Sequence, residues 1–493
     1  MNISVKRLSV FLLALLMLLC AAACGKKPGT EDGSDVASGT NGDNAAQTDP
    51  EGDGTPDLPE NMNLDRTVNI LVRSEFKDEF VPDDKTADVL SAAIFARNSA
   101  VSETLGVKLN FTDIACDEFT GPYGGSPFHA AIVKVMSAGS DTYQIIANFA
   151  YFSVSYIQQG YFLELNTLAN SYLDISKPYW NSNYYSEAAL NGKNYYLLGD
   201  ICTTAMTEAE VIYYNETLVK NYLGEDVDLL QKVYDKEWTY NYLLDCIAAV
   251  GSGEETGVWG MSATNSSYSV DGFLAGLGLT LVKTSPDAQP QVTVTDSHNI
   301  DITNALRKLY HSNASMYVAE AGEPFRKGQS MFYADYMKYA QYLTNEKISY
   351  GMLPFPLWDE NQKDYYPTSH DAYTVLGIPR TCEKPEEITA VLELMAYESR
   401  QQVRPALYYK CYSLRYLGTN EKAMMFDFII DKLSYNFGYI YSDVLKNPSD
   451  SLGAMHIFRY DVVQNKNDLM TQVYGQAGVY KQNLKKLLKA FYE

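Results

Sequence analysis

Apolar positions early in the chain predict strands and helices in alternation. Residues 67–73 (TVNILVR) are predicted to form a buried strand, and residues 88–105 carry apolar side chains at helical spacing. Gly106 ends this predicted helix, and residues 107–111 (VKLNF) alternate as a second strand. A strand, a helix and a strand at this spacing imply a parallel pair and therefore an α/β sheet.

The same alternation returns further along the chain. A predicted helix around residues 128–138 is closed by Gly139 and is followed by a short strand at 143–147. Residues 373–378 predict another strand, and Pro385 begins another helix. Because these strands are far apart in sequence, we expect an α/β lobe that the chain leaves and re-enters.

The beginning of the chain has a different pattern. A lysine and an arginine precede an uncharged apolar run at residues 8–19, and three alanines then lead to Cys24. This order predicts a secretory signal peptide over residues 1–23, since the run is too short for a comfortable membrane span. The ending resembles a bacterial lipobox, which implies that Cys24 becomes the N-terminus and carries a diacylglycerol. The alternative is a secreted protein with a chance cysteine.

Residues 25–61 are rich in small and polar residues and have almost no large apolar side chains. Such a segment cannot bury enough apolar surface to offset its ordering entropy. We therefore predict that residues 24–61 form a lipidated cysteine and a disordered acidic tether. Carboxylates within residues 49–60 have the spacing of an EF-hand calcium loop, but prolines interrupt it and no predicted helices flank it, which favours a chance match.

Composition and charge narrow the function classes. The chain has 493 residues, enough for two lobes with separate cores, and a formal net charge of −22. No cluster of lysine and arginine follows residue 30, so nucleic acid is excluded as an expected partner. The cysteines that follow Cys24 are odd in number and contain no C-x-x-C, so buried free thiols are favoured over disulfides or a zinc site.

A series of blocks, taken in order, resembles the family 1 extracellular solute-binding proteins of the maltodextrin type. The resemblance covers roughly residues 65–493. The blocks are IFARNSAVSETLGVKL (94–109), YFLELNTL (161–168), ISKPYWN (175–181), LNGKNYYLLGD (190–200), VIYYNETLVKNYL (211–223), KEWTYNYLLD (236–245), KGQSMFYAD (327–335), YGMLPFPLWDENQKDYYPTSHDAYTVLGIPR (350–380) and DKLSYNFGYIY (431–441). Their order and spacing, rather than one signature, carry the resemblance.

The resemblance implies an α/β, two-lobed, periplasmic-binding-protein-like fold of type II, with a hinge and an interlobe cleft. Crossings between lobes are expected near Asp200 to Met206, near Tyr333 to Lys338 and after Glu398. The expected lobes are residues 65–200 plus 338–398 for the first and 201–337 plus 399–493 for the second. The implied function is capture of a solute, a sugar or oligosaccharide, and its delivery to the permease of an ABC importer. The protein would act as a monomer without a cofactor, anchored through Cys24 on the extracellular face of the bacterial cytoplasmic membrane.

Sugars present flat C–H faces and rims of hydroxyl groups, which aromatic rings and carboxylates or amides recognise. The 40 tyrosines and 4 tryptophans fit such a ligand. The resemblance places the candidates in loops that border the cleft, while helix caps and turns are the alternative for each aspartate. The candidate ligand-binding residues are Arg73, Glu75, Asn148, Tyr151, Asn265, Tyr268, Tyr333, Asp335, Asp371 and Tyr373.

Two other classes stay open at this stage. A secreted carbohydrate-active enzyme needs two carboxylates across a cleft, and the 61 acidic residues do not exclude such a pair. The chain contains no G-x-S-x-G, H-E-x-x-H or phosphate-loop motif, and its five histidines lack metal-ligand spacing. We therefore predict neither a catalytic residue nor a metal site. A surface sensor or adhesion lipoprotein with the same fold is the other alternative.

Overall fold

The computed structural model describes residues 54–82, 88–116, 126–285, 288–319, 322–343, 348–412, 420–446 and 453–492. The predicted signal peptide, Cys24 and most of the predicted tether therefore lie outside the described residues. Within the described part of the chain, every helix is too short or too polar to cross a membrane.

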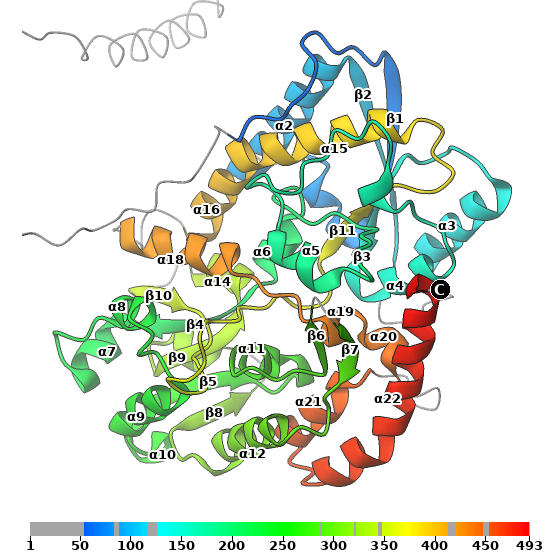
Figure 1. Ribbon diagram of the computed structural model, residues 1–493. Helices are drawn as coiled ribbons and strands as arrows, with labels where there is room; N and C mark the ends of the chain where they lie inside the picture. The colour runs from blue at the N-terminus through cyan, green and yellow to red at the C-terminus, as the bar shows by residue number, and fades with distance from the viewer. Residues whose placement is uncertain are drawn as a thin grey trace, which may run out of the picture. The chain divides into compact units, whose positions relative to one another are not determined.

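The first sheet has four strands in the order β11-β3-β1-β2 (Figure 1). Their bounds are β1 Arg66–Arg73, β2 Val107–Ile114, β3 Ile145–Phe149 and β11 Thr374–Gly377. β1 runs parallel to both β2 and β3, whereas β11 is antiparallel to β3. The parallel pair of β1 and β2 confirms the predicted strand pairing. β11, far along the chain, pairs with β3, which confirms that the chain leaves this α/β sheet and later returns to it. This sheet and the helices packed on it are called the first lobe.

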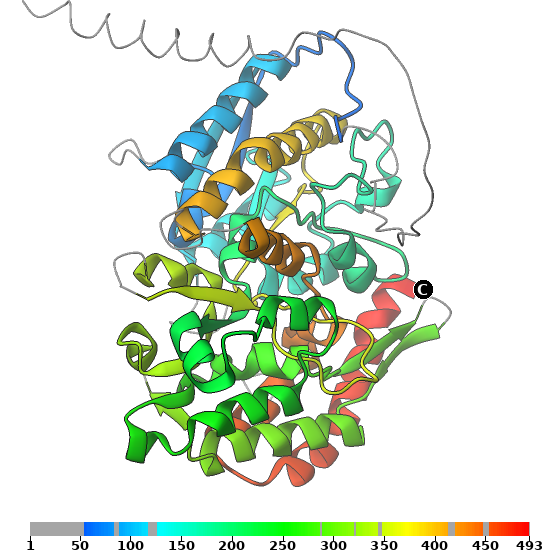
Figure 2. The same ribbon diagram turned by 90° about the vertical axis from the view of Figure 1, so that its left-hand side faces the viewer.

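Three helices of the first lobe, α2, α3 and α15, lie within one residue of the ends that the sequence pattern predicts. Gly106 follows α2 and Gly139 follows α3, both with left-handed backbone geometry at φ 60°. α2 and α15 lie side by side in both views (Figure 1, Figure 2). The helices that pack around this sheet are α2 (Val89–Leu105), α3 (Pro127–Ala138), α4 (Ala150–Gln158), α5 (Ser182–Ala188), α6 (Thr203–Thr207), α15 (Pro385–Glu398) and α16 (Arg404–Tyr412).

The second sheet has five strands in the order β10-β4-β9-β5-β8. Their bounds are β4 Glu210–Asn215, β5 Trp259–Thr264, β8 Met316–Ala319, β9 Ser330–Tyr336 and β10 Tyr350–Leu353. A separate hairpin is formed by β6 (Val282–Ser285) and β7 (Ala288–Val292) and contacts α19 and α22. This sheet and the elements packed on it are called the second lobe.

The remaining helices pack around the second sheet or lie where the lobes meet. Those in the first part of the second lobe are α7 (Glu216–Leu223), α8 (Leu229–Tyr234), α9 (Tyr240–Val250), α10 (Gly253–Thr256), α11 (Asp271–Gly276), α12 (Ser297–Ser312), α13 (Glu323–Arg326) and α14 (Ala340–Leu343). Those after residue 419 are α18 (Asn420–Asp431), α19 (Phe437–Ile440), α20 (Ser442–Leu445), α21 (Met455–Val463) and α22 (Leu469–Tyr492). α20 contacts both α4 and α22, so the end of the chain packs against both lobes.

Two segments near the lobe junction correct the boundaries expected from sequence. β10 falls in the range 338–398 that was assigned to the first lobe, but it pairs antiparallel with β4 of the second sheet. Residues 399–412 were assigned to the second lobe, but α16 packs against α2. The chain therefore returns to the first lobe between β10 and β11. The sequence did not reveal this, because tertiary packing decides which sheet a short apolar strand joins. The rest of the division into lobes stays a prediction.

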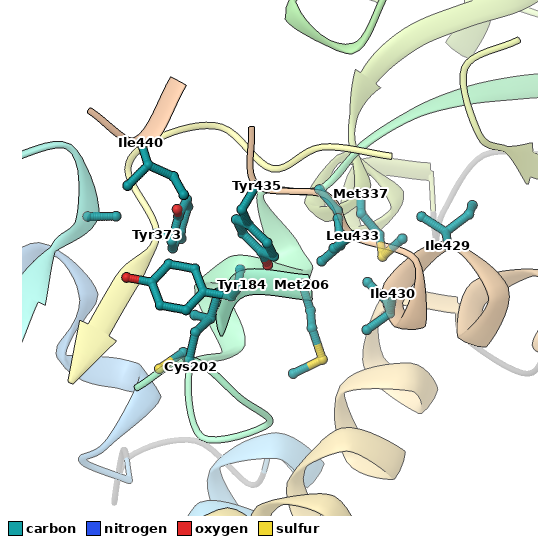
Figure 3. Close-up of a cluster of buried hydrophobic side chains, with 14 of the residues drawn as sticks. Tyr184, Cys202, Met206, Met337, Tyr373, Ile429, Ile430, Leu433, Tyr435 and Ile440 are labelled. Carbon is teal, nitrogen blue, oxygen red and sulfur yellow. The ribbon is translucent and has the colours of Figure 1, made fainter. Parts of the chain in front are cut away.

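Aromatic and sulfur-containing side chains fill the region where the connecting segments meet (Figure 3). Tyr184, Tyr373 and Tyr435 gather there with Cys202 and Met206, and all five are buried. The described cysteines whose side chains are placed, Cys116, Cys202, Cys246 and Cys382, are buried and are not joined in disulfides. This confirms the preference for buried thiols at those four positions.

Candidate functional site

A buried ion pair lies at the centre of the candidate site. Arg459 on α21 donates from Nε to Oδ1 of Asp271 at 2.7 Å, and both side chains are almost fully buried. Tyr439 on α19 donates its hydroxyl to Asp271 and accepts a hydrogen bond from Arg459 Nη2 at 2.7 Å. Burial alone would lower the pKa of Arg459, but Asp271 and Tyr439 raise it well above its usual value. The guanidinium is therefore charged and fixed in position.

Aromatic rings gather around this ion pair. The Arg459 guanidinium lies over the Tyr268 ring at 4.4 Å from its centroid. The His370 and His456 rings meet Tyr268 edge to face, at centroid distances of 5.0 Å and 5.8 Å. Tyr336, at the end of β9, meets His370 in the same way at 5.5 Å. Tyr268 and Tyr336 are only half-buried, so part of each ring is accessible.

Polar groups from the first lobe complete the site. Asp371, just before β11, lies 3.8 Å from Arg459 Nη2 and 3.6 Å from His370 Nε2. Burial raises the pKa of Tyr151 on α4, and Asp371, Arg459 and Tyr268 are among the neighbours that act on its hydroxyl. The site therefore draws on both lobes. We call it the arginine cluster, and its members are Tyr151, Tyr268, Asp271, Tyr336, His370, Asp371, Tyr439, His456 and Arg459.

His456 has an unused hydrogen-bond donor. Burial and then the charge of Arg459 lower the pKa of His456 to about 3, against the opposing effect of Asp371. The ring is therefore neutral near pH 7. Its Nε2 lies 3.4 Å from Arg459 Nη1, and since a guanidinium only donates, Nε2 accepts and the proton sits on Nδ1. That buried Nδ1 has no hydrogen-bond partner among the described residues.

Two carboxyl groups beside the cluster differ in their hydrogen-bond partners. Glu210, the first residue of β4, accepts a hydrogen bond from the Gly272 amide at 2.7 Å, and its Oε1 has no partner among the described residues. Burial and then the nearby Asp271 raise the pKa of Glu210 well above its usual value. Glu208 instead accepts a hydrogen bond from Lys338 at 2.6 Å. Glu210 is therefore held by a backbone amide, and Glu208 by an ion pair with Lys338.

The structure brings together three of the residues predicted from sequence, namely Tyr151, Tyr268 and Asp371. Tyr333 and Asp335 lie on β9, where the Tyr333 hydroxyl donates to Asp335 and the Tyr333 ring stacks in the core of the second lobe. Tyr373 is buried and meets Tyr435 edge to face at 5.3 Å (Figure 3).

The other predicted residues lie at strand ends or on the surface. Arg73 is buried at the end of β1, where it donates to the Ala372 carbonyl at 2.8 Å. Asn148 is also buried, and its amide donates to the Tyr196 hydroxyl at 3.3 Å. Glu75 accepts from the Cys116 amide, and Asn265 is exposed.

Sequence reasoning missed most of the cluster. Arg459, His456 and Tyr439 lie in the last part of the chain, and Asp271 follows Tyr268 by three residues. His370 stood beside a predicted residue but was not selected. The sequence offered one usable signal for the cluster. His370 stands next to Asp371 in the segment that precedes β11, the strand with which the chain re-enters the first lobe. Nothing local marks Arg459, because its role depends on partners almost 190 residues away.

The cluster is suited to binding rather than to holding an ion. It offers half-buried rings and the carboxylate of Asp371, which together fit hydroxyl groups and flat apolar faces. The described residues contain no group of three or more His, Cys, Asp or Glu side chains that could hold a metal ion.

The family model described as bacterial extracellular solute-binding protein matches residues 106–401. No curated protein matches the chain.

Several solved structures share the fold. The GacH receptor of Streptomyces glaucescens, studied unliganded and with acarbose, has a TM-score of 0.54 and 14% identity, covering 86% of this chain and 99% of that chain. A Staphylococcus aureus extracellular solute-binding protein in complex with maltose has a TM-score of 0.55 and 14% identity, covering 85% and 98%. A Listeria monocytogenes ABC substrate-binding protein in complex with cycloalternan has a TM-score of 0.51 and 13% identity, covering 86% and 99%.

Proposed function

Since the chain belongs to the bacterial extracellular solute-binding protein family, we propose that it captures a sugar or oligosaccharide between its lobes and delivers it to an ABC importer permease. The observation that carries this proposal is the arginine cluster, which draws rings and hydrogen-bonding groups from both lobes. Three solved structures of the same fold have acarbose, maltose or cycloalternan bound, and this supports a carbohydrate as the solute.

The charge balance of the cluster favours an uncharged solute. Arg459 is already paired with Asp271, and Lys338 is paired with Glu208. Neither cation needs a carboxylate or phosphate from the solute. The half-buried rings of Tyr268 and Tyr336 can cover sugar faces, while the carboxylate of Asp371 can accept hydrogen bonds from hydroxyl groups. A neutral polyhydroxy compound satisfies all of these groups.

We also propose that the solute is bound without being cleaved. Hydrolysis of a glycoside requires a carboxylic acid and a second carboxylate on opposite sides of the scissile bond. Glu210 and Asp271 lie close together, but both side chains are buried, at 2% and 0% exposure. Asp271 is further committed to Arg459 and Tyr439. Neither carboxyl is positioned to reach a sugar at the accessible rings.

Anchoring and assembly are part of the same proposal. Lipidation at Cys24 would hold the protein at the extracellular face of the membrane, and residues 24–61 would give it reach toward the permease. The protein would act as a monomer. Replacing Cys24 by serine (Cys24→Ser) removes the acylated thiol, so the variant should move from the membrane fraction to the culture medium, as measured by immunoblotting. Equal membrane retention of the variant would contradict lipid anchoring.

A thermal-shift screen of the purified protein against mono- and oligosaccharides tests the central proposal. A ligand bound only by the folded state stabilises it by about 2.7 kcal/mol at 100-fold excess over Kd. We expect a rise in Tm for one glycan class, with the glycan recovered intact by chromatography. No shift across the panel would remove the support for carbohydrate, and recovery of cleaved glycan would overturn binding without turnover.

A further inference from the structure

A cavity of about 260 Å³ lies next to the arginine cluster and shares Tyr439 with it. The other members of the cluster do not line this cavity. Met455 lines it, whereas the neighbouring His456 faces Tyr268 and Arg459. Tyr439, which hydrogen-bonds Asp271, therefore borders both the arginine cluster and this cavity.

The lining combines hydrogen-bonding groups with apolar surface. Its principal side chains are Glu187, Thr280, Thr368, Asn436, Leu281 and Met455. The Glu187 carboxylate accepts from the Ser434 hydroxyl and from the Tyr435 amide. Because two carboxylate oxygens can together accept about four hydrogen bonds, Glu187 keeps capacity for a bound molecule.

The charge and size of the cavity restrict what it can hold. Of the described residues that line it, none is a lysine or an arginine, so nothing there would balance an anion. Pockets for drug-sized ligands measure about 300–1,000 Å³, so this cavity lies just below that range. It fits a single small ring or a short polyol, with hydroxyl groups toward Glu187 and Thr368 and an apolar face toward Leu281.

The same elements serve the cavity and the cluster. α11 places Asp271 in the cluster and Ala275 in the cavity, and α21 places Arg459 and Met455 in the same way. Glu187 on α5 comes from the first lobe, whereas Thr280 comes from the second. A molecule in the cavity would therefore contact both lobes and the helices that hold the ion pair.

We propose that this cavity is a second ligand-binding site, separate from the solute site, for an uncharged polyhydroxy compound about the size of one sugar ring.

Isothermal titration calorimetry of the full chain with glycerol, D-glucose and myo-inositol tests the proposal. We expect saturable binding of at least one probe. Ala275→Leu fills the cavity from a helix and should weaken that binding at least tenfold. Thr280→Val removes one hydroxyl at nearly constant volume and should weaken it about threefold to tenfold. Ala248→Leu, at an exposed position on α9, is the matched control and should bind as the native chain does.

Tyr268→Ala separates the two sites, because Tyr268 belongs to the cluster and does not line the cavity. It should retain probe binding in full. The absence of saturable binding by all three probes would overturn the proposal. Unchanged binding in both Ala275→Leu and Thr280→Val would overturn it as well. If Tyr268→Ala loses probe binding and Ala275→Leu keeps it, the probe occupies the solute site, and the proposal of a second site is overturned. Circular dichroism confirms the fold of each variant.

Discussion

Tyr268 is held by contacts on several sides, with Arg459 over its ring at 4.4 Å and the edges of His370 and His456 against it. Such a fixed and partly accessible ring is a good platform for one face of a sugar. We expect Tyr268→Ala to weaken sugar binding about tenfold, since a desolvated ring contact of this kind contributes about 1–2 kcal/mol. Calorimetric titration with the glycan found by thermal shift measures the change.

Tyr474→Ala is the matched control for this substitution. Tyr474 lies on α22 and is 58% exposed, so its loss should leave sugar affinity unchanged. Equal affinities of the native protein and Tyr268→Ala would show that the solute binds elsewhere.

The protonation of the single residue His456 makes the free energy of unfolding depend on pH. Its pKa of about 3 in the folded state lies below the ordinary value of 6.5, so the folded protein binds fewer protons than the unfolded chain between these values. The His456 contribution is therefore fully present above pH 6.5 and is lost as the pH falls toward 3. The loss approaches about 1.4 kcal/mol per pH unit within that window.

His456→Phe removes the titrating group and keeps a ring beside Tyr268. Urea unfolding of both proteins at pH 7, 5 and 4 measures the effect. The free energy of unfolding should fall more steeply for the native protein than for the variant as the pH decreases. Asp371 and Arg459 are present in both proteins, so the difference between the two pH profiles reports the titration of His456 alone. Parallel pH profiles would contradict the lowered pKa.

At the scale of elements, α11 depends on glycine for its close approach to a neighbouring segment. A Cβ at Gly276 would lie 2.5 Å from Phe355 Cβ, which is held close to its own backbone and cannot swing away. We expect Gly276→Ala to lower the free energy of unfolding by about 1–3 kcal/mol. Gly475→Ala on α22 meets nothing within 4 Å and should raise it by about 0.5–1 kcal/mol. Urea unfolding measures both changes. If the two substitutions change the free energy of unfolding in the same direction, this account of α11 is contradicted.

The elements that could be predicted from sequence are those fixed by local pattern. The apolar run of β1, the alternation of β2 and the glycine that ends α2 each specify their own structure. β10 is different, because four apolar residues do not reveal which sheet they join. The arginine cluster was unpredictable for the same reason, since Arg459 acquires its role only when folding brings it to Asp271.

At the scale of the whole molecule, the segments that join the lobes lie side by side. The Glu210 amide donates to the Thr368 carbonyl at 2.9 Å, and the His370 amide donates to the Glu208 carbonyl at 3.0 Å. The Met337 amide donates to the Ala209 carbonyl at 2.7 Å, so the end of β9 joins the same group. A narrow set of paired segments is the arrangement in which small backbone rotations turn one lobe relative to the other.

We therefore expect sugar binding to bring the lobes together. Fluorescent labels at Glu103→Cys on α2 and Asp245→Cys on α9 report the distance between lobes by energy transfer, in a background with Cys24→Ser and Cys411→Ser. Burial raises the pKa of Cys246 to about 12 and of Cys382 to about 11, so these native thiols should resist labelling. Transfer between the labels should increase on saturation with the bound glycan.

A second label pair, at Asp245→Cys and Lys308→Cys, lies entirely within the second lobe and should show constant transfer. If the interlobe pair also stays constant while calorimetry confirms binding, the lobes do not close on the solute. The arginine cluster would then bind a sugar in a fixed arrangement. A permease could not distinguish the loaded from the empty protein by lobe position, because a ligand shifts a conformational equilibrium only by its differential affinity for the two states.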